Sequence, residues 1–142
     1  MILSSRAATV VVAAALALLA GCGGGTPKRD PVYPVTGSVQ TKGQRAANVR
    51  VTFLAIDRQD GPATETEVIT DLSGQFKMTT YATGDGLPPG RYAVLMIWPE
   101  MMTDDPALGG DRLGGRYNNR QKPAFTIEVK AEPNTLKPFD VK

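Results

Sequence analysis

The run Leu87-Pro88-Pro89-Gly90-Arg91-Tyr92-Ala93-Val94-Leu95-Met96-Ile97-Trp98 decides the fold of this chain. It is apolar at every position from Tyr92 to Trp98, which predicts a strand that is covered on both faces in the middle of a sheet. Pro89 pre-sets a bend before this strand, and Gly90 tolerates backbone angles that other residues avoid. An L-x-P-G-x-Y run is typical of a tyrosine corner, in which the Tyr92 hydroxyl hydrogen-bonds to the backbone a few residues upstream.

The chain on either side of this run alternates between apolar and polar residues, with turn residues at short intervals. This pattern predicts strands and no helix after residue 21. The turn Asp71-Leu72-Ser73-Gly74 predicts a tight hairpin, with Asp71 at its first position and Gly74 in the left-handed conformation. We expect an all-β fold, a seven-stranded Greek-key β-sandwich of Ig-like type. The expected strands lie at 35–40, 49–55, 68–70, 76–79, 91–98, 125–130 and 136–141.

The first 21 residues have the pattern of a secretory signal peptide. Arg6 supplies a positive charge, and the apolar run from 7 to 20 is shorter than the ~20 residues that cross a bilayer core. The run ends in Leu19-Ala20-Gly21-Cys22, which is typical of a bacterial lipoprotein cleavage site between Gly21 and Cys22. Its thiolate makes Cys22 the residue suited to lipid attachment. An uncleaved transmembrane helix and a cleaved signal without lipid are the two alternatives.

The predicted signal peptide and lipidation site divide the chain into three parts and predict where the protein lies. We expect a signal peptide at 1–21, the lipidated cysteine with a flexible Gly- and Pro-rich linker at 22–32, and one folded domain at 33–142. The protein would lie outside the cytoplasm, held to a membrane by lipid on Cys22, at the periplasmic or outer-membrane face. That covalent lipid is the only cofactor that we expect.

Composition restricts the chemistry. The chain has no histidine and one cysteine, which excludes histidine-based catalysis and, once Cys22 carries lipid, thiolate chemistry and disulfides. With 16 basic and 14 acidic residues, it shows no basic cluster of the kind that binds nucleic acid. We therefore expect neither an enzyme nor a nucleic-acid partner.

The order of the short motifs resembles a known family. Val35-Thr36-Gly37-Ser38-Val39, the turn that starts at Asp71, and the run that starts at Leu87 stand in the order seen in the carboxypeptidase-regulatory-like, or transthyretin-like, β-sandwich. Together with the Cys22 motif, the chain resembles small lipoproteins of planctomycete-type bacteria over residues 33–142. The resemblance implies a non-enzymatic module of the cell envelope and no catalytic residues. The related hydrolases of this fold use histidines, which this chain lacks.

The segment from 99 to 123 is longer than the sandwich requires, and segments of this kind usually carry function. Its carboxylates suggest Ca²⁺ ligands, although their spacing matches no calcium loop, so we predict no metal site. Its methionines and tyrosine favour either a contact surface or packing onto the sandwich. The candidate binding residues of this segment are Asp104, Asp105, Asp111 and Tyr117.

These observations leave three functions open. The first is a lipid-anchored module with a structural or protein-interaction role, whose partner is an envelope protein. The second is a module that binds carbohydrate or Ca²⁺. The third is an enzyme, or the accessory domain of an envelope enzyme. The fold alone does not choose among them.

Overall fold

The computed structural model describes residues 24–25, 28–102, 104–105 and 109–142. Within these residues the chain is all-β and has no helix, as predicted. No helix of the described part is long and apolar enough to cross a membrane. The nine strands are β1 (Val35–Thr41), β2 (Gln44–Arg45), β3 (Arg50–Ala55), β4 (Glu65–Ile69), β5 (Gln75–Lys77), β6 (Gly90–Ile97), β7 (Phe125–Val129), β8 (Asn134–Thr135) and β9 (Phe139–Val141).

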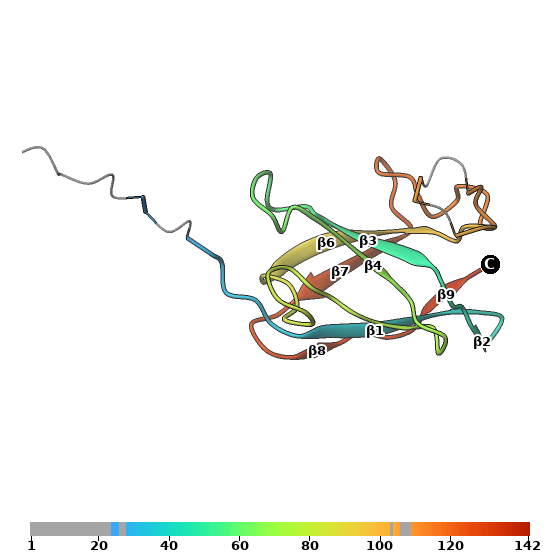
Figure 1. Ribbon diagram of the computed structural model, residues 1–142, viewed down its shortest axis with the longest axis horizontal. Helices are drawn as coiled ribbons and strands as arrows, with labels where there is room; N and C mark the ends of the chain where they lie inside the picture. Colours follow the sequence, from blue (N-terminus) through green and yellow to red (C-terminus); the bar gives the residue numbers. More distant parts are fainter. Residues whose placement is uncertain (1–23, 26–27, 103, 106–108) are drawn as a thin grey trace, which may run out of the picture.

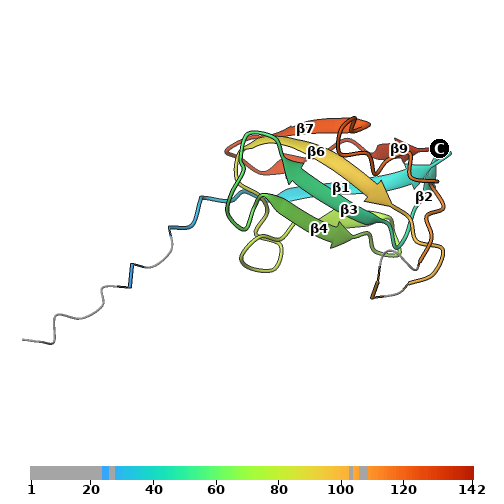
Figure 2. The same cartoon turned by 90° about the horizontal axis from the view of Figure 1, so that it is seen from above.

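The strands form two sheets that face each other in a sandwich-like arrangement (Figure 1). One sheet is antiparallel throughout, in the order β4-β3-β6-β7. The other is mixed and built around β1, which pairs antiparallel with β2 and β5 and parallel with β8 and β9. Seen from above, β3, β4 and β6 run across the direction of β1 (Figure 2).

The described residues contain nine strands, two more than the expected seven. The first additional strand, β2, forms because the turn after Thr41 closes a short hairpin with the end of β1. The second arises because the expected strand at 136–141 is replaced by two short strands, β8 and β9, and Pro138 lies in the break between them. Proline donates no ladder hydrogen bond, so a break at this position is physically reasonable.

The core lies between the two sheets and is built from alternate residues of each strand. Val35 and Val39 of β1 face Val51 and Phe53 of β3, and all four are buried. Strand β6 is buried on both faces, as the apolar run predicted: Val94 points into the core, and Leu95 on the opposite face is only 1% exposed. The outer face of the four-stranded sheet must therefore be covered as well.

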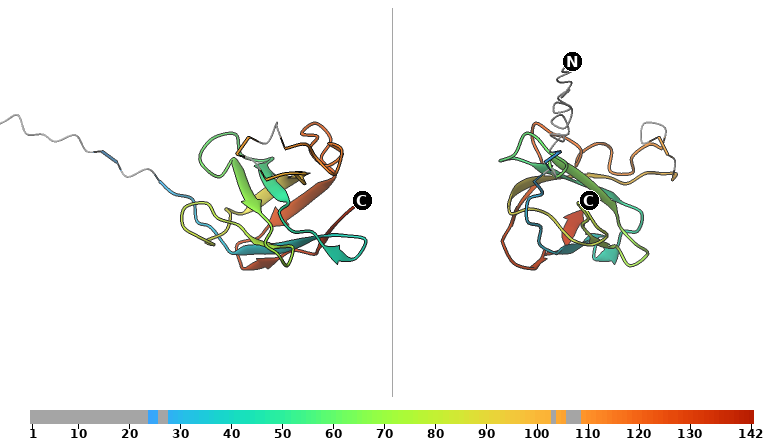
Figure 3. Two further views of the ribbon diagram at one scale, coloured as in Figure 1. Left: turned by 45° about the vertical axis from the view of Figure 1, so that its right-hand side comes forward. Right: turned by 60° about the vertical axis from the view of Figure 1, so that its left-hand side comes forward.

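The molecule has two different ends, which Figures 1 and 3 show. At the linker end, the chain enters through residues 28–32 and the loops 56–64, 78–89 and 130–133 come together. At the loop end lie the turns 42–43 and 71–74, the described parts of the long loop 98–124, and the C-terminus. The linker and the long loop thus lie at opposite ends of the folded body.

Candidate functional site

Tyr92, near the start of β6, is the residue at which the sequence predicts a tyrosine corner. Its hydroxyl donates a hydrogen bond to the Pro88 carbonyl oxygen over 2.8 Å, and the residue is 1% exposed. Burial raises the pKa of the Tyr92 hydroxyl. Gly90 has φ +149°, a region that favours glycine. The Tyr92 hydroxyl is therefore used in holding the connection and is not presented to a ligand.

The hairpin turn at Asp71 lies at the loop end. The Asp71 carboxylate accepts hydrogen bonds from the backbone N–H groups of Ser73 and Gln75, at 2.7 and 3.0 Å. Gly74 has φ +71° and packs so closely that a Cβ there would lie 2.7 Å from the Val39 carbonyl oxygen. Both residues therefore shape the turn, and they leave Leu72 87% exposed at its tip.

Asp111 organises the base of the long loop. One carboxylate oxygen accepts hydrogen bonds from the backbone N–H groups of Trp98 and Leu113, both at 2.9 Å. The other oxygen accepts one from the N–H of Gly115, also at 2.9 Å. Of the candidate binding residues, Asp111 is therefore committed to holding its own loop together.

Tyr117 also has a structural environment. Its ring stacks on Phe125 at 5.8 Å between centroids, and its hydroxyl accepts a hydrogen bond from the Lys142 N–H at 3.0 Å. Its carbonyl oxygen accepts one from the N–H of Met96. The residue thus packs onto the sandwich and ties the loop to the C-terminus, one of the two environments that the sequence suggested.

The same loop reaches across the outer face of the four-stranded sheet. Arg120, just before β7, forms a two-pronged ion pair with Glu65 of β4, at the other edge of that sheet, over 2.6 and 3.1 Å. The Arg120 guanidinium holds the pKa of the Glu65 carboxyl below its ordinary value. This connection places the loop over the apolar outer face of β6.

Four described residues of the long loop, 101, 102, 104 and 105, are exposed to solvent. Met101 is 64% exposed and Met102 is 52% exposed. Asp104 and Asp105 are exposed as well. Among the described residues there is no group of three or more histidine, cysteine, aspartate or glutamate side chains that could hold a metal ion.

A hollow at the linker end was not anticipated from the sequence. It has a volume of about 450 Å³ and is lined by Lys28, Arg29, Asp30, Arg58, Asp60, Gly61, Pro62 and Tyr81. The linker itself forms one wall, and the loops 56–64 and 78–89 form the others. No local motif marks these residues, because their partners come from three separate stretches of the chain.

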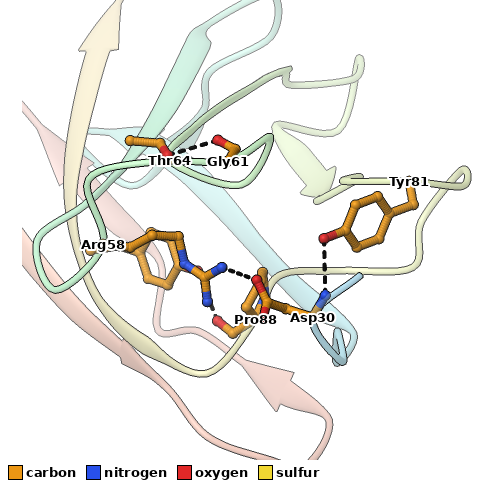
Figure 4. Close-up of polar contacts among 7 residues, drawn as sticks. Asp30, Arg58, Gly61, Thr64, Tyr81 and Pro88 are labelled. Carbon is orange, nitrogen blue, oxygen red and sulfur yellow. Dashed lines mark hydrogen bonds and ion pairs between the residues drawn. The ribbon is translucent and has the colours of Figure 1, made fainter. Parts of the chain in front are cut away.

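Figure 4 shows the contacts that Asp30 makes with Arg58 and Tyr81 in this hollow. Asp30 forms an ion pair with Arg58, and its backbone N–H donates to the Tyr81 hydroxyl oxygen over 3.3 Å. The guanidinium of Arg29 lies 5.2 Å from the centre of the Tyr81 ring, a distance suited to a cation–π contact. The Asp30 carboxylate raises the pKa of Arg58. These contacts join the linker to the body.

Gly21 and Cys22, the cleavage and lipidation residues expected from the sequence, lie outside the described residues. Comparison with known proteins adds no relative: no family model and no curated protein matches the chain.

Proposed function

We propose that this chain is a bacterial lipoprotein of the cell envelope, whose folded domain binds another protein and carries out no catalysis. Lipid on Cys22 would hold residues 33–142 at a membrane surface outside the cytoplasm. We further propose that the domain is a Greek-key sandwich of the carboxypeptidase-regulatory-like, or transthyretin-like, kind. The order of the turn motifs at Val35, Asp71 and Leu87 supports this assignment.

The observation that carries the proposal is the separation of the linker from the long loop. A domain tethered through residues 28–32 presents its opposite end, with the loop 98–124, away from the point of attachment (Figure 3). Asp111, Tyr117 and Arg120 hold this loop in place, and Met101 and Met102 are left exposed. Methionine side chains are flexible and polarizable, which suits them to protein contact surfaces.

The anchor is tested on the protein purified from bacterial membranes. Mass spectrometry should find a mature N-terminus at Cys22 that carries diacylglycerol. The Cys22→Ala variant should keep residues 1–21 and should carry no lipid. Wild-type protein with an unmodified cysteine, or with the leader still attached, would contradict the anchor.

The interaction role is tested with a photo-crosslinking amino acid in living cells. Positions 101 and 102 should crosslink to the same protein, and position 83, an exposed residue at the linker end, should not. Met101→Asp should reduce the crosslink from position 102, because a charge in a contact surface costs binding energy. Equal crosslinking from 83 and 102 would contradict the proposed surface.

A further inference from the structure

The linker end contains a docking site for the chain's own linker. Residues 28–31 run along the hollow between the loops 56–64 and 78–89, and they make three kinds of contact there: an ion pair, a hydrogen bond and a cation–π contact. Composition alone suggested a flexible spacer over this stretch. We infer that residues 28–31 act as a strap, bound reversibly to Arg58 and Tyr81, that sets how far the domain stands from its point of attachment.

The receiving surface is held in shape by contacts that do not involve the strap. The Asp85 carboxylate accepts hydrogen bonds from the backbone N–H groups of Thr80, Tyr81 and Ala82, at 2.8 to 2.9 Å. The Thr80 hydroxyl donates to the Gly86 carbonyl oxygen over 2.7 Å. The loop that carries Tyr81 is thus fixed by its own hydrogen bonds, so the ring is in position to receive Arg29.

The other wall has similar internal support. The Thr64 hydroxyl donates to the Gly61 carbonyl oxygen over 2.7 Å and closes the loop next to Arg58 (Figure 4). With the strap in place, the Arg58 side chain is only 25% exposed. The strap therefore binds between two preformed loops, and it need not order them when it docks.

Docking changes the reach of the tether. With the strap bound, the six-residue separation from Cys22 to Lys28 limits the reach of the tether to about 20 Å. With the strap released, the ten-residue separation from Cys22 to Val32 raises this limit to about 35 Å. The strap therefore keeps loops 56–64 and 78–89 near the anchor, and its release lets the domain move away or turn. This consequence rests on the proposed lipidation of Cys22, whereas the docking itself does not.

Docking is tested by trypsin digestion of the full chain in detergent. The bonds after Lys28 and Arg29 should be cut slowly, because proteolysis requires the strap to leave the surface. Tyr81→Ala and Arg58→Gln leave the strap sequence unchanged, and each should raise the cutting rate at these bonds about five- to tenfold. Asp60→Asn, in the same hollow, is the matched control and should not raise it.

Cutting after Lys42, an exposed residue in the β1–β2 turn, reports whether a variant is still folded. It should proceed at the same rate in all of these proteins. If trypsin cuts after Arg29 at the same rate in the wild type and in Tyr81→Ala, while the rate after Lys42 is unchanged, the strap proposal is wrong.

The effect on reach is tested in vesicles that hold the lipidated protein. A fluorophore on Thr83→Cys, at the linker end, should be quenched by lipids labelled on the headgroup. A second substitution, Tyr81→Ala, should weaken the quenching. A fluorophore on Leu72→Cys at the loop end should be quenched less in both proteins. If the strap is protected from trypsin but Cys22 carries no lipid, the proposed anchor is wrong and the strap proposal stands. If Cys22 carries lipid but the strap is not protected, the strap proposal is wrong and the anchor stands.

Discussion

At the scale of single residues, three aspartates organise the loops of this protein. Asp71, Asp85 and Asp111 each accept hydrogen bonds from two or three backbone N–H groups of nearby turns. Such N–H groups have no partner within a sheet, so a carboxylate satisfies them and fixes the turn. The acidic side chains of the long loop thus have different roles: Asp111 holds the loop in place, and Asp104 is exposed.

Replacing Asp111 tests whether this residue, unlike the exposed Asp104, stabilises the loop. Asp111→Ala removes the acceptor for Trp98, Leu113 and Gly115. We expect the free energy of unfolding to fall by about 2 kcal/mol, the scale of hydrogen bonds to a charged group. Urea denaturation measures this change. Asp104→Ala is the control and should change the midpoint little, and equal losses in the two variants would contradict the role of Asp111.

The Asp85 carboxylate makes the stability of the protein depend on pH. Burial alone would raise its pKa, but the hydrogen bonds from Thr80, Tyr81 and Ala82 outweigh burial, so the pKa lies below its ordinary value. Because the folded pKa is below the unfolded one, the stabilisation is present above about pH 4 and is lost as the pH falls through the folded pKa. The difference in unfolding free energy between the wild type and Asp85→Asn should therefore be constant from pH 7 to 5 and shrink below pH 4. Denaturation series at each pH measure it, and a constant difference down to pH 2 would contradict this assignment.

The variant Tyr92→Phe tests whether the tyrosine corner stabilises the fold. Tyr92→Phe removes only the hydroxyl that donates to Pro88, and should cost about 1–2 kcal/mol of unfolding free energy while leaving the fold intact. Tyr33→Phe serves as the matched control, because no hydrogen bond of the Tyr33 hydroxyl occurs among the described residues. An unchanged denaturation midpoint for Tyr92→Phe would show that the hydroxyl does not stabilise the connection.

At the scale of elements, the connection into β6 depends on a close contact between two distant segments. Tyr33, just before β1, and Leu87, just before β6, exchange two backbone hydrogen bonds, each of 3.0 Å. Gly86 lies against this bridge with φ +102°, and a Cβ there would be 1.7 Å from the Tyr33 carbonyl oxygen. No side chain fits at this position unless the bridge opens.

Gly86→Ala should therefore destabilise the fold strongly. We expect a loss of about 2 kcal/mol or more, because both the backbone conformation and the contact with Tyr33 oppose a Cβ. Gly43→Ala is the matched control: Gly43 also has a positive φ, of +76°, but open space surrounds the Cβ position. Thermal unfolding of the two variants compares them, and an equal fall in melting temperature would show that steric contact at Gly86 adds nothing to backbone strain.

The elements that the sequence predicted well are those whose cause is local. Alternation predicted β1, β3 and β7, and the apolar run predicted that β6 is covered on both faces. The Asp71-Leu72-Ser73-Gly74 turn was predictable because the hydrogen bonds of the Asp71 carboxylate, to Ser73 and Gln75, lie within five residues. The hollow around Arg58 was not predictable, because Asp30, Arg58 and Tyr81 lie far apart in the sequence and meet only in the folded chain.

At the scale of the whole molecule, one chain of aromatic rings joins the two sheets. Phe53 of the antiparallel sheet contacts Phe76 of the mixed sheet at 5.8 Å between centroids, and Phe76 stacks on Phe139 at 6.3 Å. Phe139 contacts Phe125 of the antiparallel sheet at 5.0 Å. The rings therefore cross the core from one sheet to the other twice, which makes each sheet depend on the other.

Removing the Phe76 ring, which lies in the middle of this chain, should destabilise both sheets together. Phe76 lies directly beneath Gly37, where a Cβ would come within 2.5 Å of the ring, so Gly37 offers no side chain to fill the space that Phe76→Ala leaves. We expect the free energy of unfolding to fall by about 3–5 kcal/mol, and to fall less for Phe76→Leu, which keeps part of the side-chain volume.

The single tryptophan, Trp98, reports on the loop end, and far-ultraviolet circular dichroism reports on both sheets. In urea the two signals should change at the same midpoint in the wild type and in Phe76→Leu, because the rings couple the sheets in one cooperative unit. A tryptophan transition at lower urea than the dichroism transition would show instead that the loop end unfolds on its own.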